Sequence, residues 1–130
     1  EKEMANTFKV VNFAAEPATA GANSGLAYVV YTAPGSTTTV VLGLTLANIH
    51  TAQVTADVYL VSDTGSRGGA TGSLVANGNS LIVKGAPIPV GGALELMSGN
   101  KIVLETTDQI VIDCSIADKL SGTLSIMEIT

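Results

Sequence analysis

Short runs of alternating apolar and polar residues, with turn-forming residues about every eight to twelve positions, restrict the fold of this chain more than any other feature. The clearest run is Val54–Ser62, in which every second residue from Val54 to Leu60 is apolar. No segment has a convincing helical period or helix caps. The pattern predicts an all-β chain that folds as a single β-sandwich of about eight or nine antiparallel strands, either immunoglobulin-like or jelly-roll.

Two prolines in the stretch Lys84–Glu105 limit where its strands can lie. Pro87 and Pro89 have no N–H to donate, so this part of the chain is expected at a sheet edge or in a crossing between strands. Gly91-Gly92 is expected to bend the chain. The following segments predict a short strand, a hairpin turn and a return strand, at Ala93–Met97, Ser98–Asn100 and Lys101–Glu105.

The remaining strands are expected at Asn6–Phe13, Leu26–Tyr31, Thr37–Asn48, Leu81–Val83, Gln109–Ser115 and Gly122–Ile129. Gly43, inside the third of these, indicates a β-bulge or the close approach of another backbone. The segment Ala14–Gly25 lacks a period and is rich in Ala and Gly, so it predicts a long loop or an extended arm. A glycine-rich loop is expected at Asp63–Gly72, with a helical turn as one interpretation of Ser73–Asn77.

The alternation also assigns a core, consisting of Leu42, Leu44, Leu96, Val103, Ile110, Ile112 and Leu124. Cys114, the single cysteine, alternates with Asp113 and is expected to share this core as an inert small hydrophobe. In the last strand, Leu124 and Ile126 share one face with Glu128 as a further candidate, and Ser125, Met127 and Ile129 lie on the other.

Length and charge limit the function classes. The chain has 130 residues, which predicts one domain over 1–130 with a candidate N-terminal arm within 1–25. It has no apolar run long enough for a membrane span and no apolar region typical of a signal peptide, so no membrane partner is expected. The net charge is −5 and the 6 basic residues are scattered, which argues against a nucleic-acid partner.

The surface composition is unusual, because 46% of residues are hydrophobic and only 13% are charged. One explanation is that part of the outside is buried against copies of the chain or against a partner. The other is that small residues such as Gly, Ala, Ser and Thr cover the surface instead. The sequence leaves both explanations open.

No constellation of residues predicts chemistry. His50 is the single histidine and lies in an expected turn, so a serine or cysteine nucleophile would lack a base nearby in sequence. The segment Gly65–Gly69 lacks the Gly-Lys-Ser/Thr ending of a phosphate-binding loop. Carboxylates such as Asp57 and Asp108 are expected on solvent faces or in turns, with few aromatic residues for a sugar site. We therefore expect no enzyme, no cofactor and no metal site.

Five segments in the C-terminal half carry a resemblance to a known family: Lys84–Pro89 (KGAPIP), Gly91–Leu96 (GGALEL), Asn100–Glu105 (NKIVLE), Thr107–Ile110 (TDQI) and Leu124–Thr130 (LSIMEIT). This half of the chain resembles small β-sandwich virion structural proteins of tailed bacteriophages. The resemblance covers about Leu81 to Thr130. The shared residues look structural, so the resemblance implies no functional residue.

The resemblance implies a structural part of a phage particle, most simply a capsid decoration (cement) protein that stabilises the shell by oligomeric binding. Its partners would be copies of itself and major capsid or neck or tail proteins, on the exterior of a virion made in the host cytoplasm. One alternative is a neck, collar or tail accessory or fibre protein. A more distant alternative is a carbohydrate- or receptor-binding module.

The N-terminal strand and the arm after it are the candidate contacts between copies or with a partner. The residues proposed for this role are Phe8, Val10, Phe13, Pro17 and Arg67.

Overall fold

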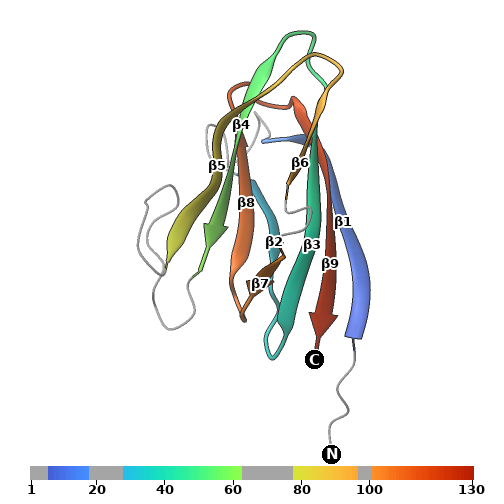
Figure 1. The fold of residues 1–130 in the computed structure, drawn as a ribbon, viewed down its shortest axis with the longest axis vertical. Helices are drawn as coiled ribbons and strands as arrows, with labels where there is room; N and C mark the ends of the chain where they lie inside the picture. The colour runs from blue at the N-terminus through green and yellow to red at the C-terminus, as the bar shows by residue number, and fades with distance from the viewer. Residues whose placement is uncertain (1–5, 18–27, 63–77, 97–100) are drawn as a thin grey trace, which may run out of the picture.

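The computed structural model describes residues 6–17, 28–62, 78–96 and 101–130, and these residues form strands and turns without a helix (Figure 1). The strands are β1 (Asn6–Glu16), β2 (Tyr28–Thr32), β3 (Thr38–Asn48), β4 (Val54–Val61), β5 (Asn79–Ile88), β6 (Ala93–Leu96), β7 (Ile102–Leu104), β8 (Gln109–Cys114) and β9 (Leu120–Ile129). All their pairings are antiparallel, and the predicted all-β sandwich is confirmed.

The strands form two sheets that pack face to face. Sheet A has the order β1-β9-β3-β6, with β7 also paired to β3, and sheet B has the order β2-β8-β4-β5. The strand pairs are therefore nested one inside the next. The innermost pair is β4–β5, and outside it β3 pairs with β6 and β7. Then β2 pairs with β8, and β1 pairs with β9 as the outermost pair. This is one long hairpin rolled into two sheets, which is the jelly-roll topology. An immunoglobulin-like sandwich keeps its first two strands in one sheet, whereas β1 and β2 lie in different sheets.

The core lies between the sheets and follows the predicted alternation in most strands. In β4, Val54, Ala56 and Val58 are buried, and in β9 Leu124 and Ile126 face inward with Glu128. The largest fully buried side chains are Val41, Leu44, Leu46, Val54, Val58, Ile88, Leu104, Ile110, Ile112, Leu120, Leu124 and Ile126. The burial of such side chains, each contributing about 1.5–3 kcal/mol, is the main force that holds the two sheets together.

The prolines lie where the missing donors are tolerated. β5 pairs only with β4 and is an edge of sheet B, and the exposed Pro87 lies within it. Gly91 has a φ of 72°, and the Gly92 N–H donates to the Pro89 carbonyl at 2.9 Å, which closes a tight turn before β6. The predicted edge position and the predicted bend are both confirmed.

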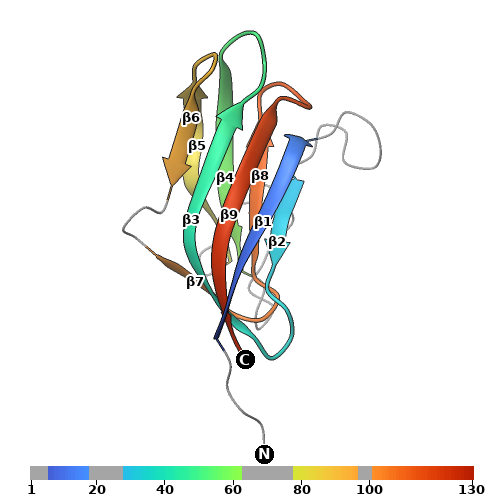
Figure 2. The same ribbon diagram turned by 90° about the vertical axis from the view of Figure 1, so that its right-hand side faces the viewer.

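The predicted hairpin over Ala93–Glu105 is wrong. Both β6 and β7 pair antiparallel with β3, through Leu44–Leu96 and Val41–Ile102 among other pairs. They are consecutive pieces of one broken edge strand on the same side of β3 (Figure 2). The residues predicted as the hairpin turn, Ser98–Asn100, lie outside the described residues. Turn-forming residues predict a break in a strand, but they do not say whether the chain reverses there.

Two predicted core residues lie on the outside instead. The pairing of β3 with β9 shifts between Val41 and Gly43, so the expected bulge at Gly43 is confirmed. The shift inserts one residue, which turns Val41 and Leu44 inward and leaves Leu42 half-buried. In β7, Ile102 and Leu104 face inward, so Val103 is 58% exposed. A register error of one residue moves a side chain to the opposite face.

The expected strand Asn6–Phe13 continues to Glu16, so the beginning of the predicted arm is strand rather than loop. The expected strand Leu81–Val83 is likewise the middle of the longer β5. The predictions for Asp63–Gly72 and Ser73–Asn77 lie outside the described part of the chain.

Candidate functional site

The outer face of sheet A carries a row of apolar side chains across four strands. Phe8 of β1 lies opposite Met127 of β9, Met127 lies opposite Val40 of β3, and Val40 lies opposite Val103 of β7. Directly opposite residues in antiparallel strands point to the same side, so these four side chains form one continuous line, here called the apolar row. Its two ends are the most exposed, with Phe8 at 71% and Val103 at 58%.

Val10 extends the apolar row along β1. It faces the same side as Phe8, lies opposite Ser125 and is 64% exposed. Most of the other outward residues on this face are Asn, Ser, Thr and Ala, together with Leu42, Glu95 and Ile129. Among the described strand residues of sheet A whose side chains point outward, Glu95 is the only charged one. The face is therefore apolar along one line and nearly uncharged elsewhere.

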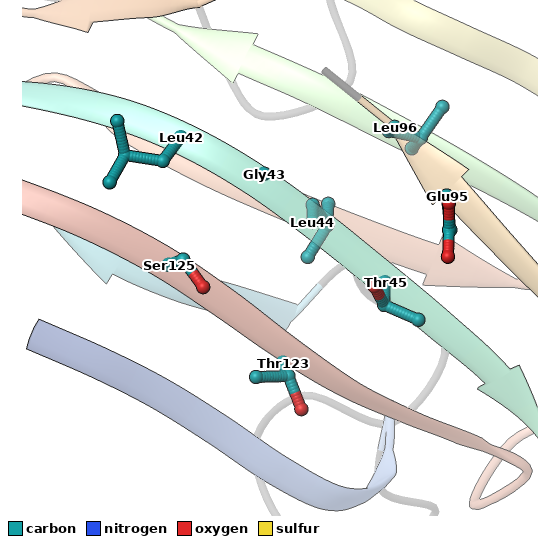
Figure 3. A pocket seen from close by; sticks show the side chains of 8 residues that line it. All are labelled: Leu42, Gly43, Leu44, Thr45, Glu95, Leu96, Thr123 and Ser125. Carbon is teal, nitrogen blue, oxygen red and sulfur yellow. The ribbon is translucent and has the colours of Figure 1, made fainter. Parts of the chain in front are cut away.

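A shallow recess of about 220 Å³ lies beside the apolar row, where the bulge interrupts β3. Gly43 forms its floor without a side chain, and Thr45, Glu95, Thr123 and Ser125 supply polar groups around it (Figure 3). β3 provides Gly43 and Thr45, β9 provides the residues at 123 and 125, and β6 provides Glu95. The residues that line the recess supply hydroxyls and one carboxylate, and they include no histidine or lysine.

A partly buried polar cluster joins β1 to β9 and β3 of sheet A and to β2 of sheet B, at the end of the sandwich that holds the C-terminus. The Glu128 carboxylate accepts from the Lys9 ammonium at 2.7 Å and from the Tyr31 hydroxyl at 2.5 Å. The Tyr31 hydroxyl also lies 2.9 Å from the Thr39 hydroxyl. Lys9 is the one charged residue between Asn6 and Phe13. In this cluster it is paired with Glu128 on the inner side of sheet A.

The pKa values of the cluster favour a structural role. Hydrogen bonds from Lys9 and then from Tyr31 lower the pKa of Glu128 below its ordinary value. Burial, followed by the hydrogen bond to Glu128, raises the pKa of Tyr31 to about 12. At neutral pH the carboxylate is therefore charged and the phenol is neutral, and neither is poised to exchange a proton.

Two carboxylates meet on the outer face of sheet B. Asp57 and Asp113 lie directly opposite each other on β4 and β8. Asp57 accepts from the Gly85 N–H at 2.6 Å and lies 3.5 Å from the Lys84 ammonium. Burial, with a smaller effect of the Asp57 charge, raises the pKa of Asp113. Within residues 6–17, 28–62, 78–96 and 101–130, no group of three or more His, Cys, Asp or Glu residues could hold a metal ion.

The other residues considered for chemistry are separated in the fold. His50 follows β3 in a turn, where its N–H donates to the Asn48 side chain at 2.7 Å. Cys114 is half-buried at the end of β8 and packs against the core, and burial raises the pKa of its thiol. Asp108 lies at the expected turn before β8, but its side chain is buried there rather than on a solvent face. It is 4% exposed, and its carboxylate accepts from the Glu105 N–H at 3.0 Å, which caps the turn.

The predicted contact residues do not all reach the surface. Phe8 and Val10 lie on the outer face of sheet A, whereas Phe13 is buried at 7% exposure and Pro17 is buried at the end of β1. The side chain of Phe13 points to the inner side of β1, and its ring centroid lies 5.5 Å from that of Tyr28. Neither residue offers a surface to a partner. Arg67 lies outside the described residues.

Sequence reasoning missed most of the apolar row. Val103 was assigned to the core, and Val40 and Met127 were not singled out as surface residues. The outward parity of Met127 was recognised, but the row becomes visible only when four strands that are distant in sequence are set in register.

The described part of the chain contains no helix long and apolar enough to cross a membrane. Comparison with models of known protein families, with curated proteins and with solved structures finds no match for this chain.

Proposed function

We propose that this chain is a structural assembly protein that associates with copies of itself and that binds a partner protein through the outer face of sheet A. The observation that carries the proposal is the apolar row on a face with a single charged strand residue. Folding does not require Phe8, Val10 or Val103 to be apolar, because their side chains lie outside the core. Depletion of charge around aromatic and aliphatic side chains is typical of the centre of a protein interface.

We further propose that the assembly is a phage particle and that the chain decorates or cements its capsid. Two considerations support this: the resemblance of residues 81–130 to virion structural proteins, and the jelly-roll topology, which recurs in viral capsid domains. The same topology serves lectins and cupins, so the fold alone does not assign the function. A protein that binds the assembled shell and not its free subunits stabilises the shell by mass action.

Other functions receive less support. A sugar-binding module needs aromatic rings beside its polar groups, and the side chains around the recess include none. A neck, collar or tail position fits the same face, because it also needs only area and shape. The copy number distinguishes these positions, since a cement protein accompanies the shell subunits in large number and a neck or tail protein does not.

The first experiment is quantitative mass spectrometry of particles purified from cells that produce this chain. A copy number comparable to that of the major shell protein supports the cement role. A far smaller number assigns the chain to the neck or tail, which overturns the cement proposal and keeps the structural one. Absence from particles, with the chain remaining in the soluble fraction, overturns both.

The second experiment tests the face itself with a matched pair of variants. Val103 and Val90 are both 58% exposed, but Val103 lies on the apolar row and Val90 lies in the turn before β6. Val103→Lys is expected to abolish co-sedimentation with particles, whereas Val90→Lys is expected to bind like the unmodified chain. Equal binding of both variants would show that the outer face of sheet A is not the contact surface.

A further inference from the structure

We infer that two copies of this chain pair edge to edge through β1, about a two-fold axis, so that sheet A continues from one copy into the other. The inference rests on the self-association in the proposed function and names the strand that performs it. It starts from the edges of the two sheets, because an edge strand presents unpaired N–H and C=O groups that another strand can use.

Three of the four edges are poor templates for another strand. β5 contains Pro87 and an exposed Lys84, and its register with β4 shifts twice. β2 is 5 residues long and also shifts against β8. β6 and β7 have 4 and 3 residues and do not form one continuous edge. Prolines, bulges, lysines and short length are the features by which proteins block edge pairing.

Along its first part β1 has no proline and no bulge and is not short, although it carries one lysine. It pairs with β9 without a register shift from Asn6 to Phe13, and the residues from Asn6 to Val10 are all exposed. The one lysine in this part, Lys9, points to the inner side of sheet A, where its ammonium is bound to Glu128. An edge lysine usually blocks pairing with its charge. Here that charge is neutralised by a buried partner.

The occupant of this edge is a second copy of β1. A row of backbone donors and acceptors selects an extended strand, and among the described strands of this chain only β1 offers a regular open edge. Self-pairing must then use the same strand twice, which gives a closed two-fold dimer rather than a filament. No like charges meet on the outer face, because Phe8, Val10 and Asn12 are its outward residues there.

The charge on β1 also selects the register. If Lys9 lay opposite Lys9 of the partner subunit, two like charges would meet, which destabilises a strand pair. If Val10 lies opposite Val10 of the partner subunit, Lys9 lies opposite Val11 and Phe8 opposite Asn12. This register also overlaps the strands from Asn6 to Ala14, which includes the whole regular part of β1 from Asn6 to Phe13. The dimer would carry two apolar rows on one continuous face.

The test measures self-association of the full chain by analytical ultracentrifugation, with variants at the two ends of the same face. Val10→Lys places two lysines together at the two-fold axis and is expected to raise the dimer dissociation constant at least about tenfold. Val103→Lys changes a residue of similar exposure at the opposite edge of sheet A and is expected to leave the constant within about twofold. Both side chains are exposed, so neither change disturbs the core.

The outcomes separate this inference from the proposed function. Weakening by Val10→Lys alone supports the β1 dimer. Equal weakening by both variants would mean that two copies pair through the faces of sheet A rather than through β1. A monomeric unmodified chain would mean that no dimer forms. Either result overturns the inference. Neither result decides particle binding, which the Val103→Lys and Val90→Lys pair measures separately.

A cross-linking experiment tests the register. In a Cys114→Ser background, Val10→Cys is expected to form a covalent dimer with a short bis-maleimide, and Val103→Cys is expected to remain monomeric under the same conditions. Hydrogen exchange gives a second measurement, because amides of β1 that face the open edge should become protected as the protein concentration rises. Failure of Val10→Cys to cross-link, together with β1 amides whose exchange is independent of concentration, overturns the pairing.

Discussion

The contact between Gly122 and Phe13 explains a glycine inside the last strand. The two residues lie opposite each other in β9 and β1, and a Cβ atom on Gly122 would come within 2.4 Å of the Phe13 ring and 3.0 Å of the Thr45 carbonyl oxygen. The ring thus fills the space that a side chain at position 122 would need. The sequence predicts a strand at both positions, but it does not indicate that these two residues face each other.

This contact predicts that Gly122→Ala destabilises the fold by about 1–3 kcal/mol, because the new methyl group overpacks a site with backbone on one side. The measurement is the free energy of unfolding in urea. Gly35→Ala is the control, since nothing lies within 4 Å of a Cβ at that position, and it is expected to change the stability far less. Equal stability of the two variants would mean that Phe13 moves aside freely.

The second prediction at this scale concerns Glu128 and pH. Its pKa in the folded chain lies below the ordinary value because Lys9 and Tyr31 donate to the carboxylate. Its contribution to stability is therefore fully present above the pKa of the unfolded chain and is lost as the pH falls through the lower folded value. Glu128→Gln should cost about 1–3 kcal/mol at neutral pH and should flatten the loss of stability in acid.

Urea unfolding of the unmodified chain, Glu128→Gln and Glu95→Gln from neutral to acidic pH tests this. Glu95→Gln is the control, because Glu95 is exposed and lies outside the cluster, so the variant removes a carboxylate without touching Lys9 or Tyr31. A Glu128→Gln profile parallel to that of the unmodified chain would contradict the role of the cluster.

Individual strands differ in how well the sequence predicts them. Alternation assigned the inward faces of β4 and β9 correctly, because each is regular and has one face in the core. It failed at Leu42, where the bulge in β3 shifts the alternation of inward and outward side chains by one residue, and at Val103, in the short strand β7. The glycine at 43 signals the bulge, but nothing in the local sequence says which neighbouring residue turns outward. That choice follows from pairing with β9.

The bulge predicts unequal costs for neighbouring leucines in β3. Leu44 is 2% exposed, so Leu44→Ala should cost about 2–5 kcal/mol through lost burial and a cavity. Leu42 is half-buried at the edge of the recess, so Leu42→Ala should cost less than about 1.5 kcal/mol. Thermal or urea unfolding of both variants measures the difference. Equal costs would indicate that β3 runs through position 42 without the bulge.

For the whole molecule, composition indicates an unusual surface without locating it or choosing between its two explanations. The shortage of charged residues indicates that some surface is either contacted by a partner or covered by small side chains. The outer face of sheet A carries both exposed apolar side chains, which suit a contact, and small side chains such as Ser, Thr and Ala. Phe8 and Val10 were identified as contact candidates because they belong to the N-terminal strand. Val40, Met127 and Val103 could not be added, because the row depends on the register of strands that lie far apart in sequence.

The last prediction links association to stability. If dimers form through β1 and only folded chains pair, the apparent stability must rise with protein concentration, by about 1.4 kcal/mol per dimer for each tenfold increase well above the dissociation constant. The melting temperature of the unmodified chain should therefore rise over a dilution series, and that of Val10→Lys should not. Added salt should leave this dependence nearly unchanged, because the β1 edge contributes backbone hydrogen bonds and the outer face beside it contributes apolar contacts rather than exposed ion pairs. A melting temperature independent of concentration, or association that salt abolishes, would contradict an interface built on β1 and the apolar row.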